Sequence, residues 1–321
     1  IFGLHAAGET SRTSAAVEHL QYSGLSDLDV DVSDGFEGTF KASLNHVLAW
    51  NERQQAALGL GQGSSGVTTL PFDLWVEGVY ANYEGDRDGR FGMITVGADY
   101  VFGPGFLAGF YAQYDNTEET STAHLSGEGW MIGPYATARL GENVFWQGRA
   151  AWGQSSNEIV TASSGAFDTT RWLVSSELSG RWQFANGVTF SPAASFTWFE
   201  DKSDSYVDSN SITVPSVTSR LGQLKLAPQL SYGFATADGL WIEPSISPEL
   251  LWNFASSRAD GVGTLDAEAA GPDGLRGRIK AGVTVRAANG LTVTANGSYD
   301  GIGVGDDYHA ITGRLGLAFP F

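Results

Sequence analysis

Apolar and polar residues alternate with a period of two along most of the chain after residue 70. Four stretches show the pattern most regularly: residues 72–80, 94–102, 240–254 and 275–286. In the first of them Phe72 and Leu74 alternate with Asp73. Successive side chains of a β-strand point to opposite faces, so this period gives each strand one apolar and one polar face. The pattern predicts an all-β structure over residues 71–321.

Two kinds of connection separate the strands, and they alternate along the chain. Five are tight turns whose Gly, Asn or Asp tolerates a positive φ angle: Gly103-Pro104-Gly105, Gly141-Glu142-Asn143, Ala185-Asn186-Gly187, Ala237-Asp238-Gly239 and Ala288-Asn289-Gly290. Six are longer and polar, near residues 84–90, 116–123, 158–168, 201–216, 255–273 and 303–307. Five turns and six loops join twelve strands, which predicts a 12-stranded antiparallel β-barrel with its tight turns at one end.

Three features favour a membrane over a soluble β-sandwich, in which the same alternation occurs. The strands are about ten residues long, as a tilted strand needs to cross a bilayer. Short turns at one end and long loops at the other are typical of outer-membrane barrels. Aromatic residues gather at two levels: Phe102, Phe106, Trp182, Phe184, Phe190 and Phe319 near the tight turns, and Trp130, Trp152, Trp172, Trp198, Trp252 and Tyr299 near the long loops. We therefore expect a transmembrane β-barrel in a bacterial outer membrane.

The amino-terminal segment has a different pattern. Residues 1–35 are polar and acidic and are interpreted as a linker. Residues 36–60 are interpreted as a helix, because their apolar positions recur at three and four residues: Phe36, Phe40, Leu44, Val47 and Leu48. A barrel of twelve strands leaves room for about one helix, roughly 10 Å wide. We expect the helix inside the pore; the alternative is a helix that caps the barrel from outside.

Charged residues on the polar faces of the strands are expected to line the lumen. They are Glu77, Asp99, Arg139, Arg149, Glu177, Arg181, Glu243, Glu249, Arg276, Arg278, Arg286 and Arg314. Such a lining either holds the helix or keeps the cavity hydrated, and the sequence leaves both open.

Composition excludes several classes of function. The chain has 36 acidic against 18 basic residues, a formal charge of -18 that repels nucleic acid. It has no cysteine, and its five histidines lie without metal-ligand spacing, so neither a metal nor a cofactor is expected. No Gly-x-Ser-x-Gly motif occurs. We therefore expect no catalytic residues, and an enzyme on the barrel rim remains a minor alternative.

The end of the chain carries a further signal. Residues Ile311 to Phe321 alternate strictly and close on an aromatic residue, which resembles the signal by which outer-membrane proteins are recognised for barrel assembly; its members here are Leu315, Leu317, Phe319 and Phe321. The first hairpin, from Phe72 to Tyr100, resembles the opening of the autotransporter β-domain. With the preceding helix and twelve strands, the resemblance covers about residues 36–321.

The resemblance implies a type V secretion translocator, which secretes or displays an amino-terminal passenger through or with its barrel. Its implied partners are the covalently linked passenger, the barrel-assembly machinery, and outer-membrane lipid with lipopolysaccharide. Some autotransporters cleave themselves at an Asn-Asn pair in the pore helix. Here Asn45 and Asn51 are isolated, so the segment is expected to stay attached. The alternative function is a passive porin-like channel plugged by the amino-terminal helix.

Overall fold

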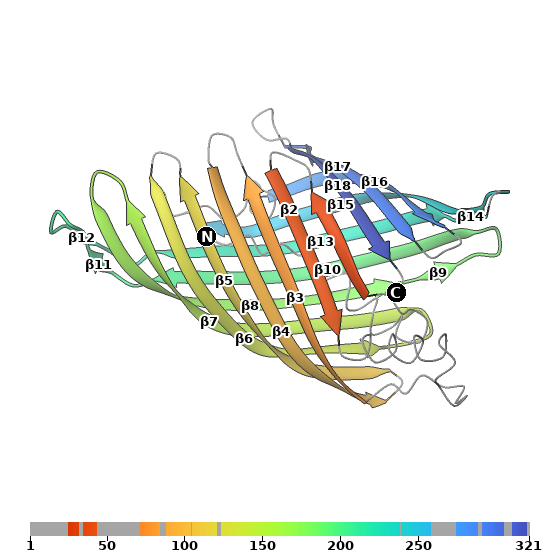
Figure 1. The fold of residues 1–321 in the computed structure, drawn as a ribbon, viewed down its shortest axis with the longest axis horizontal. Coiled ribbons are helices and arrows are strands. Elements are labelled where there is room, and N and C mark those ends of the chain that lie inside the picture. The colour runs from red at the N-terminus through yellow and green to blue at the C-terminus, as the bar shows by residue number, and fades with distance from the viewer. Residues whose placement is uncertain are drawn as a thin grey trace, which may run out of the picture.

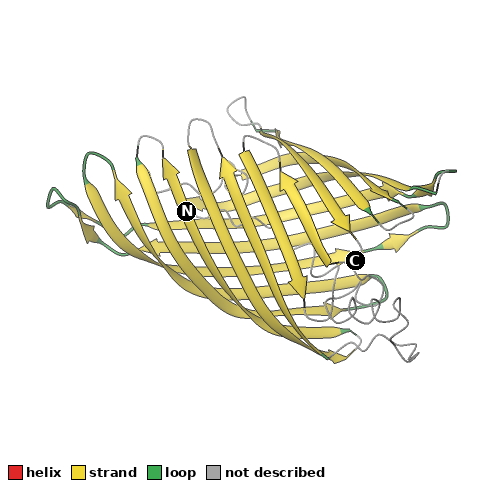
Figure 2. Ribbon diagram, viewed as in Figure 1, coloured by secondary structure: helices red, strands yellow, loops and turns green. Residues whose placement is uncertain are grey.

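The computed structural model describes residues 25–31, 35–43, 71–83, 88–103, 105–120, 123–237, 239–257, 274–287, 291–304 and 310–319. For 25–31, 35–43 and 310–319 it describes the course of the backbone. Every regular element in these ranges is a β-strand (Figure 2). Among the described residues, no helix is long and apolar enough to cross a membrane.

Fourteen long strands carry the fold, together with four two-residue strands. The long strands are β1 (Leu25–Asp31), β2 (Gly35–Ser43), β3 (Phe72–Tyr83), β4 (Asp88–Gly103), β5 (Phe106–Thr120), β6 (His124–Arg139), β7 (Val144–Val160), β8 (Ser164–Gly180), β10 (Val188–Ser203), β13 (Thr218–Tyr232), β15 (Trp241–Ser257), β16 (Gly274–Arg286), β17 (Thr292–Ile302) and β18 (Ala310–Phe319). The short ones are β9 (Trp182–Gln183), β11 (Tyr206–Val207), β12 (Thr213–Val214) and β14 (Phe234–Ala235).

Each long strand pairs antiparallel with its neighbours in sequence, as a meander does. The ladder runs from β1 to β8, then through β10, β13 and β15 to β18. It returns to its start because β18 pairs with β1. Figure 1 shows β3 to β7 side by side in the near wall and β10, β13 and β15 behind them. The expected antiparallel β-barrel is confirmed.

The amino-terminal segment departs from the expectation. Residues 25–31, interpreted as linker, form β1, and residues 35–43, where the helix was expected to begin, form β2. All twelve expected strands are present, and these two join them between β3 and β18. Phe36 and Phe40 are four residues apart, a spacing that fits a strand face as well as a helix face. Pairing with β3 along all nine residues satisfies the backbone groups on one edge of β2, and two register pairs with β1 lie on its other edge. The rest of the expected helix, including Leu44, Val47 and Leu48, lies outside the described residues.

The tight turns have the backbone that their residues predict. Gly187 and Gly239 have φ angles of 86° and 79°, a region that glycine adopts without strain. The backbone N–H of Gly187 donates to the carbonyl of Phe184 (3.0 Å), and that of Gly239 to the carbonyl of Thr236 (3.1 Å). The turns therefore reverse the chain within a few residues at one end of the barrel.

The two faces of the wall are inverted relative to a soluble protein. Large apolar side chains point outward, and Phe110 is 70% exposed. Polar side chains point inward, and Asp115 on the same strand is buried. Backbone pairing within the ladder and an apolar outer surface are what a hydrocarbon environment requires.

Outward aromatic residues contact one another near both ends of the strands. Near the long loops the ring centroids of Trp130 and Trp152 are 5.2 Å apart, and those of Trp152 and Trp172 are 6.5 Å apart. Near the tight turns Phe102 and Phe106 are 5.7 Å apart. These contacts join neighbouring strands into two aromatic levels, as membrane interfaces favour.

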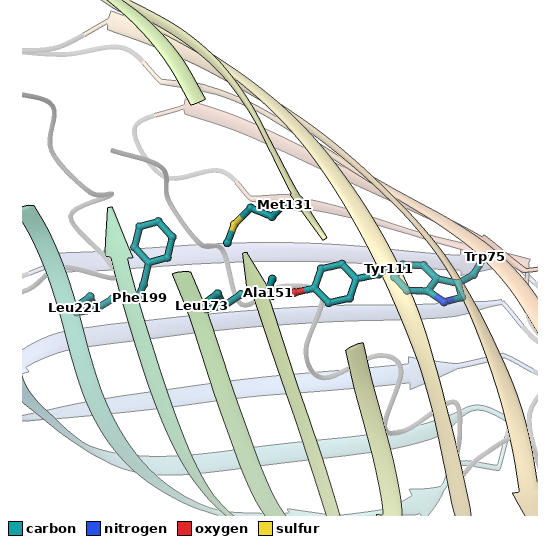
Figure 3. Packing of buried hydrophobic residues seen from close by; sticks show 7 residues of the cluster. All are labelled: Trp75, Tyr111, Met131, Ala151, Leu173, Phe199 and Leu221. Atoms are coloured by element: carbon teal, nitrogen blue, oxygen red, sulfur yellow. The ribbon is translucent and has the colours of Figure 1, made fainter. Parts of the chain in front are cut away.

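The inner face also carries one apolar band. It consists of Trp75, Tyr111, Met131, Ala151, Leu173, Phe199 and Leu221 (Figure 3). These residues come from seven strands between β3 and β13, and Figure 3 shows Ala151, Leu173, Phe199 and Leu221 on successive strands. Leu173 and Phe199 are each 1% exposed although they face the interior of the barrel.

Candidate functional site in the lumen

One buried polar arrangement of the inner wall centres on Arg171 of β8. Its Nη1 donates to both carboxylate oxygens of Asp115 on β5, at 2.9 and 3.2 Å. Its Nε lies 3.5 Å from Oδ2 of Asp201 on β10. All three side chains are buried, with Arg171 and Asp115 each 1% exposed. The three charges form the Arg171 network, which links β5, β8 and β10.

The Arg171 side chain reaches Asp115 by crossing β7 and β6. Gly129 of β6 lies beneath it, and a Cβ atom there would overlap Nη1 of Arg171. Glycine is therefore required for this close approach, which any side chain at position 129 would block. β5 and β8 are not neighbours in the ladder, so the Arg171–Asp115 contact adds a connection that backbone pairing does not make, whereas Arg171 and Asp201 lie on the paired strands β8 and β10.

A second group of charges lies on β15, β16 and β17. Nη2 of Arg278 donates to Asp300 at 2.6 Å, and Nε of Arg276 lies 3.2 Å from the other oxygen of Asp300. Glu249 accepts from Nζ of Lys280 at 3.1 Å and lies 3.7 Å from Arg278. These contacts join strands that are already paired. Among the described residues, this group holds three cations and two carboxylates, so its own formal charge is positive.

A third group lies closer to the tight turns. Nε1 of Trp75 donates to the hydroxyl of Tyr135 at 2.7 Å, and that hydroxyl donates to Asp99. The Trp75 and Tyr135 rings meet edge to face at 6.0 Å. This chain joins the apolar band, to which Trp75 belongs, to a buried carboxylate.

The structure places the charges expected in the lumen in three environments. Asp99, Glu249 and Arg276 are buried, and Glu77, Arg149, Glu177, Glu243, Arg278 and Arg286 are half-buried. Arg139 and Arg181 are exposed at strand ends. Arg139 donates to the carbonyls of Gly141 (3.0 Å) and Glu142 (2.9 Å), so it holds a tight turn. For Arg314 the backbone alone is described.

Sequence reasoning missed the residues at the centre of the Arg171 network. Asp115 and Arg171 lie on the polar faces of their strands, next to the outward residues Tyr114 and Trp172. The alternation could therefore have assigned both to the lumen. Their pairing across two intervening strands depends on the twist of the wall and carries no signal in the sequence.

The expected assembly signal lies largely in the last strand. Leu315 pairs in register with Val30 of β1 and Ala295 of β17, and Leu317 with Leu28 and Val293. Phe319 pairs with Leu25, and Phe321 lies outside the described residues. The last strand is thus bordered on both sides by strands of the same chain.

The long connection between β10 and β13 contains a hairpin, β11–β12, that packs against the loop end of β8. The rings of Tyr206 and Phe167 stack at 5.2 Å. Ser164 and Ser209 exchange two hydrogen bonds, with the N–H of Ser164 donating to Oγ of Ser209 (2.9 Å) and the N–H of Ser209 to the carbonyl of Ser164 (2.8 Å). The sequence had predicted only a polar connection here.

Asp208 closes the turn of this hairpin. Its Oδ1 accepts from the backbone N–H of Ile212 (2.7 Å) and of Asn210 (3.0 Å). The hydrogen bond from the Ile212 N–H is the main reason that the pKa of Asp208 lies below its usual value. Partial burial and the nearby Asp208 raise the pKa of Tyr206.

A wall with both signs of charge, hydroxyl groups and an apolar band can contact a polypeptide in several ways. Among the described residues, no group of three His, Cys, Asp or Glu could hold a metal ion.

Comparisons with known proteins agree with this architecture. The model of the autotransporter β-domain family matches residues 74–298. Among solved structures, the β-domain of the Bordetella autotransporter BrkA is similar at 15% identity and a TM-score of 0.51, over 94% of this chain and 100% of that one. The Pseudomonas putida toluene transporter TodX is similar at 9% identity and a TM-score of 0.51, over 100% and 94%. The translocator domain of NalP from Neisseria meningitidis follows at 14% identity and a TM-score of 0.49, over 99% and 96%. No curated protein matches.

The likeness to BrkA and TodX shows the fold, an outer-membrane β-barrel, and does not by itself separate a translocator from another transporter. The family match distinguishes a translocator from another transporter, because it covers most of the chain. The chain belongs to the autotransporter β-domain family, and it resides in the bacterial outer membrane.

Proposed function

We infer that this barrel translocates a passenger joined to its amino-terminal side and anchors it in the outer membrane, as a type V secretion unit. The observation that carries the inference is the family match over residues 74–298, which covers the wall from β3 to β17. The barrel acts as a transport unit, and any enzymatic activity belongs to the passenger.

We further propose that residues 44–60 occupy the lumen. Ser43, the last residue of β2, pairs with Trp75 of β3, so β2 ends beside the apolar band. Wide barrels leave an aqueous interior, in which inward apolar side chains would be exposed. The burial of Met131, Leu173 and Phe199 supports an apolar neighbour at this level. Leu44, Val47 and Leu48 are the expected contacts.

In this proposal the lumen charges position the segment. Residues 44–60 contain one acidic residue, Glu52, and its proposed partner is the part of the wall at Arg276 and Arg278. The final strand is proposed to engage the barrel-assembly machinery, with Leu315, Leu317, Phe319 and Phe321 as the signal. Lipopolysaccharide is the proposed partner of the long-loop end.

Single-channel conductance in planar bilayers tests the lumen occupant. Deleting residues 44–60 leaves residues 61–71 to join β2 to β3, so all strands remain. We expect the intact chain to be nearly closed and the deletion variant to conduct steadily. A control variant carries a Gly/Ser segment of equal length in place of residues 44–60, which separates loss of apolar contacts from loss of length. Equal, large conductance in the intact and deleted chains would remove the segment from the pore and favour a porin-like channel.

Secretion is tested separately, with a reporter domain fused before Ile1 and produced in a Gram-negative host. Protease added outside intact cells should cleave the reporter from cells that carry the fusion. A reporter that stays protected, in cells whose barrel is folded in the outer membrane, would contradict the translocator function.

A further inference from the structure

The outer surface of the barrel is hollowed on one side. A groove of about 800 Å³ crosses β4 to β8, strands that lie side by side in Figure 1. Its floor consists of small outward residues: Ala98, Ala108, Ala136, Gly148 and Ala150. Phe102 and Phe110 stand beside it and are 65% and 70% exposed. The groove is therefore an apolar hollow between protruding rings.

Trp146 forms a wall of the groove toward β8. Its indole lies over Gly148, where a Cβ atom would come within 2.7 Å of the ring. Its Nε1 donates to Oγ of Ser176 on β8 at 2.9 Å. The polar edge of the ring is thus satisfied within the wall, and its face is left as an apolar surface. An occupant of the groove needs no hydrogen-bonding group.

The depth of the groove follows from the strand ends. Ala150 and Val174, the lining residues farthest from the tight turns, lie six positions from Val144 and Gly180 at the strand ends. Six residues along a strand tilted by about 45° rise roughly 14 Å, slightly more than half of an apolar band roughly 25 Å tall. Short turns mark the periplasmic side. The groove therefore lies mainly within the periplasmic leaflet.

We propose that this groove holds one acyl chain of a phospholipid from the periplasmic leaflet. The groove is continuous with the apolar surface that contacts the bilayer, so hydrocarbon fills it. A hollow left empty would forfeit van der Waals contacts on both its floor and its walls. In hydrocarbon, packing of this kind is what distinguishes one apolar contact from another. A chain seated between Phe102, Phe110 and Trp146 exchanges more slowly than lipid elsewhere around the barrel.

The test uses the full chain in vesicles of phosphatidylethanolamine and phosphatidylglycerol with a trace of phospholipid carrying a photoreactive group in its acyl chain. Ala98→Trp fills the groove. Ala281→Trp is the matched control, because Ala281 is also exposed on the outer face and also lies five positions from the tight-turn end of its strand. Heat-modifiable migration shows whether both variants are folded, and Ala136→Phe replaces Ala98→Trp if that variant is not.

We expect labelling to concentrate on the outward residues of β4 to β7, to fall severalfold in Ala98→Trp and to be unchanged in Ala281→Trp. Even labelling around the barrel, or equal labelling of the groove in Ala98→Trp, would overturn the proposal. The proposal would also be overturned if the barrel purified from outer membranes retained lipid A rather than phospholipid. Crosslinking of Phe110 to a second copy of the chain would overturn it as well.

Discussion

The lumen wall and the outer rim of this barrel hold the same kinds of ion pair in opposite surroundings. Arg171 and Asp115 are each 1% exposed and have no access to bulk water. Arg220 and Glu200, near the loop end of β10 and β13, form a single pair at 2.8 Å with side chains 49% and 27% exposed. Water screens the rim pair, whereas a buried charge depends on its partner. The exposure of an ion pair to water, rather than its residue types, therefore decides how much the pair contributes to the stability of this protein.

Replacing Arg171 with Met is expected to have the largest effect. The substitution removes the cation that faces two buried carboxylates and should destabilise the barrel by about 3–5 kcal/mol. Urea unfolding in lipid vesicles, followed by tryptophan fluorescence, measures the loss. Arg220→Met is the control, with an expected cost of about 0–1 kcal/mol because its pair is exposed. An equal loss of unfolding free energy in the two variants would contradict the difference between the buried and the exposed ion pair.

Gly129→Ala tests the geometry of the same network without removing a charge. The added methyl group overlaps Nη1 of Arg171, so either the arginine or β6 must move, at a cost of about 1–3 kcal/mol. The same unfolding measurement applies. Gly141→Ala is the control, because nothing lies within 4 Å of a Cβ atom at that tight-turn position. If Gly129→Ala is as stable as Gly141→Ala, then Arg171 does not depend on this crossing.

The smallest effect is expected in the β11–β12 hairpin, whose stability should depend on pH. The folded pKa of Asp208 lies below its unfolded value, about 3.9, because the N–H of Ile212 donates to the carboxylate. The stabilisation is therefore present above about pH 4 and is lost as the pH falls through the lowered folded value. Hydrogen exchange of residues 204–217 between pH 6 and pH 3 measures it. Asp208→Asn should flatten this dependence, and an unchanged profile would assign it to another group.

The two ends of the chain show how far sequence pattern reaches. From β3 onward, strict alternation and turn residues predicted the strands, their order and the end at which each connection lies. In residues 25–31 and 35–43 the same kind of reasoning was wrong. Phe36 and Phe40 fit both a helix and a strand, and β2 is short enough that pairing with β3 decides between them. Local pattern identifies an element only where the segment is long enough for one period to exclude the other.

The sequence by itself determined the class of this protein: alternation at a period of two, tight turns at one end and aromatic levels on the apolar face define an outer-membrane barrel. Only the tertiary structure decided that β1 and β2 join the wall, that Arg171 meets Asp115 across two strands, and that small residues of four neighbouring strands form the floor of one groove. The reason is physical. Alternation is a property of neighbouring residues along one strand, whereas these features arise between strands, where twist and register bring distant residues together.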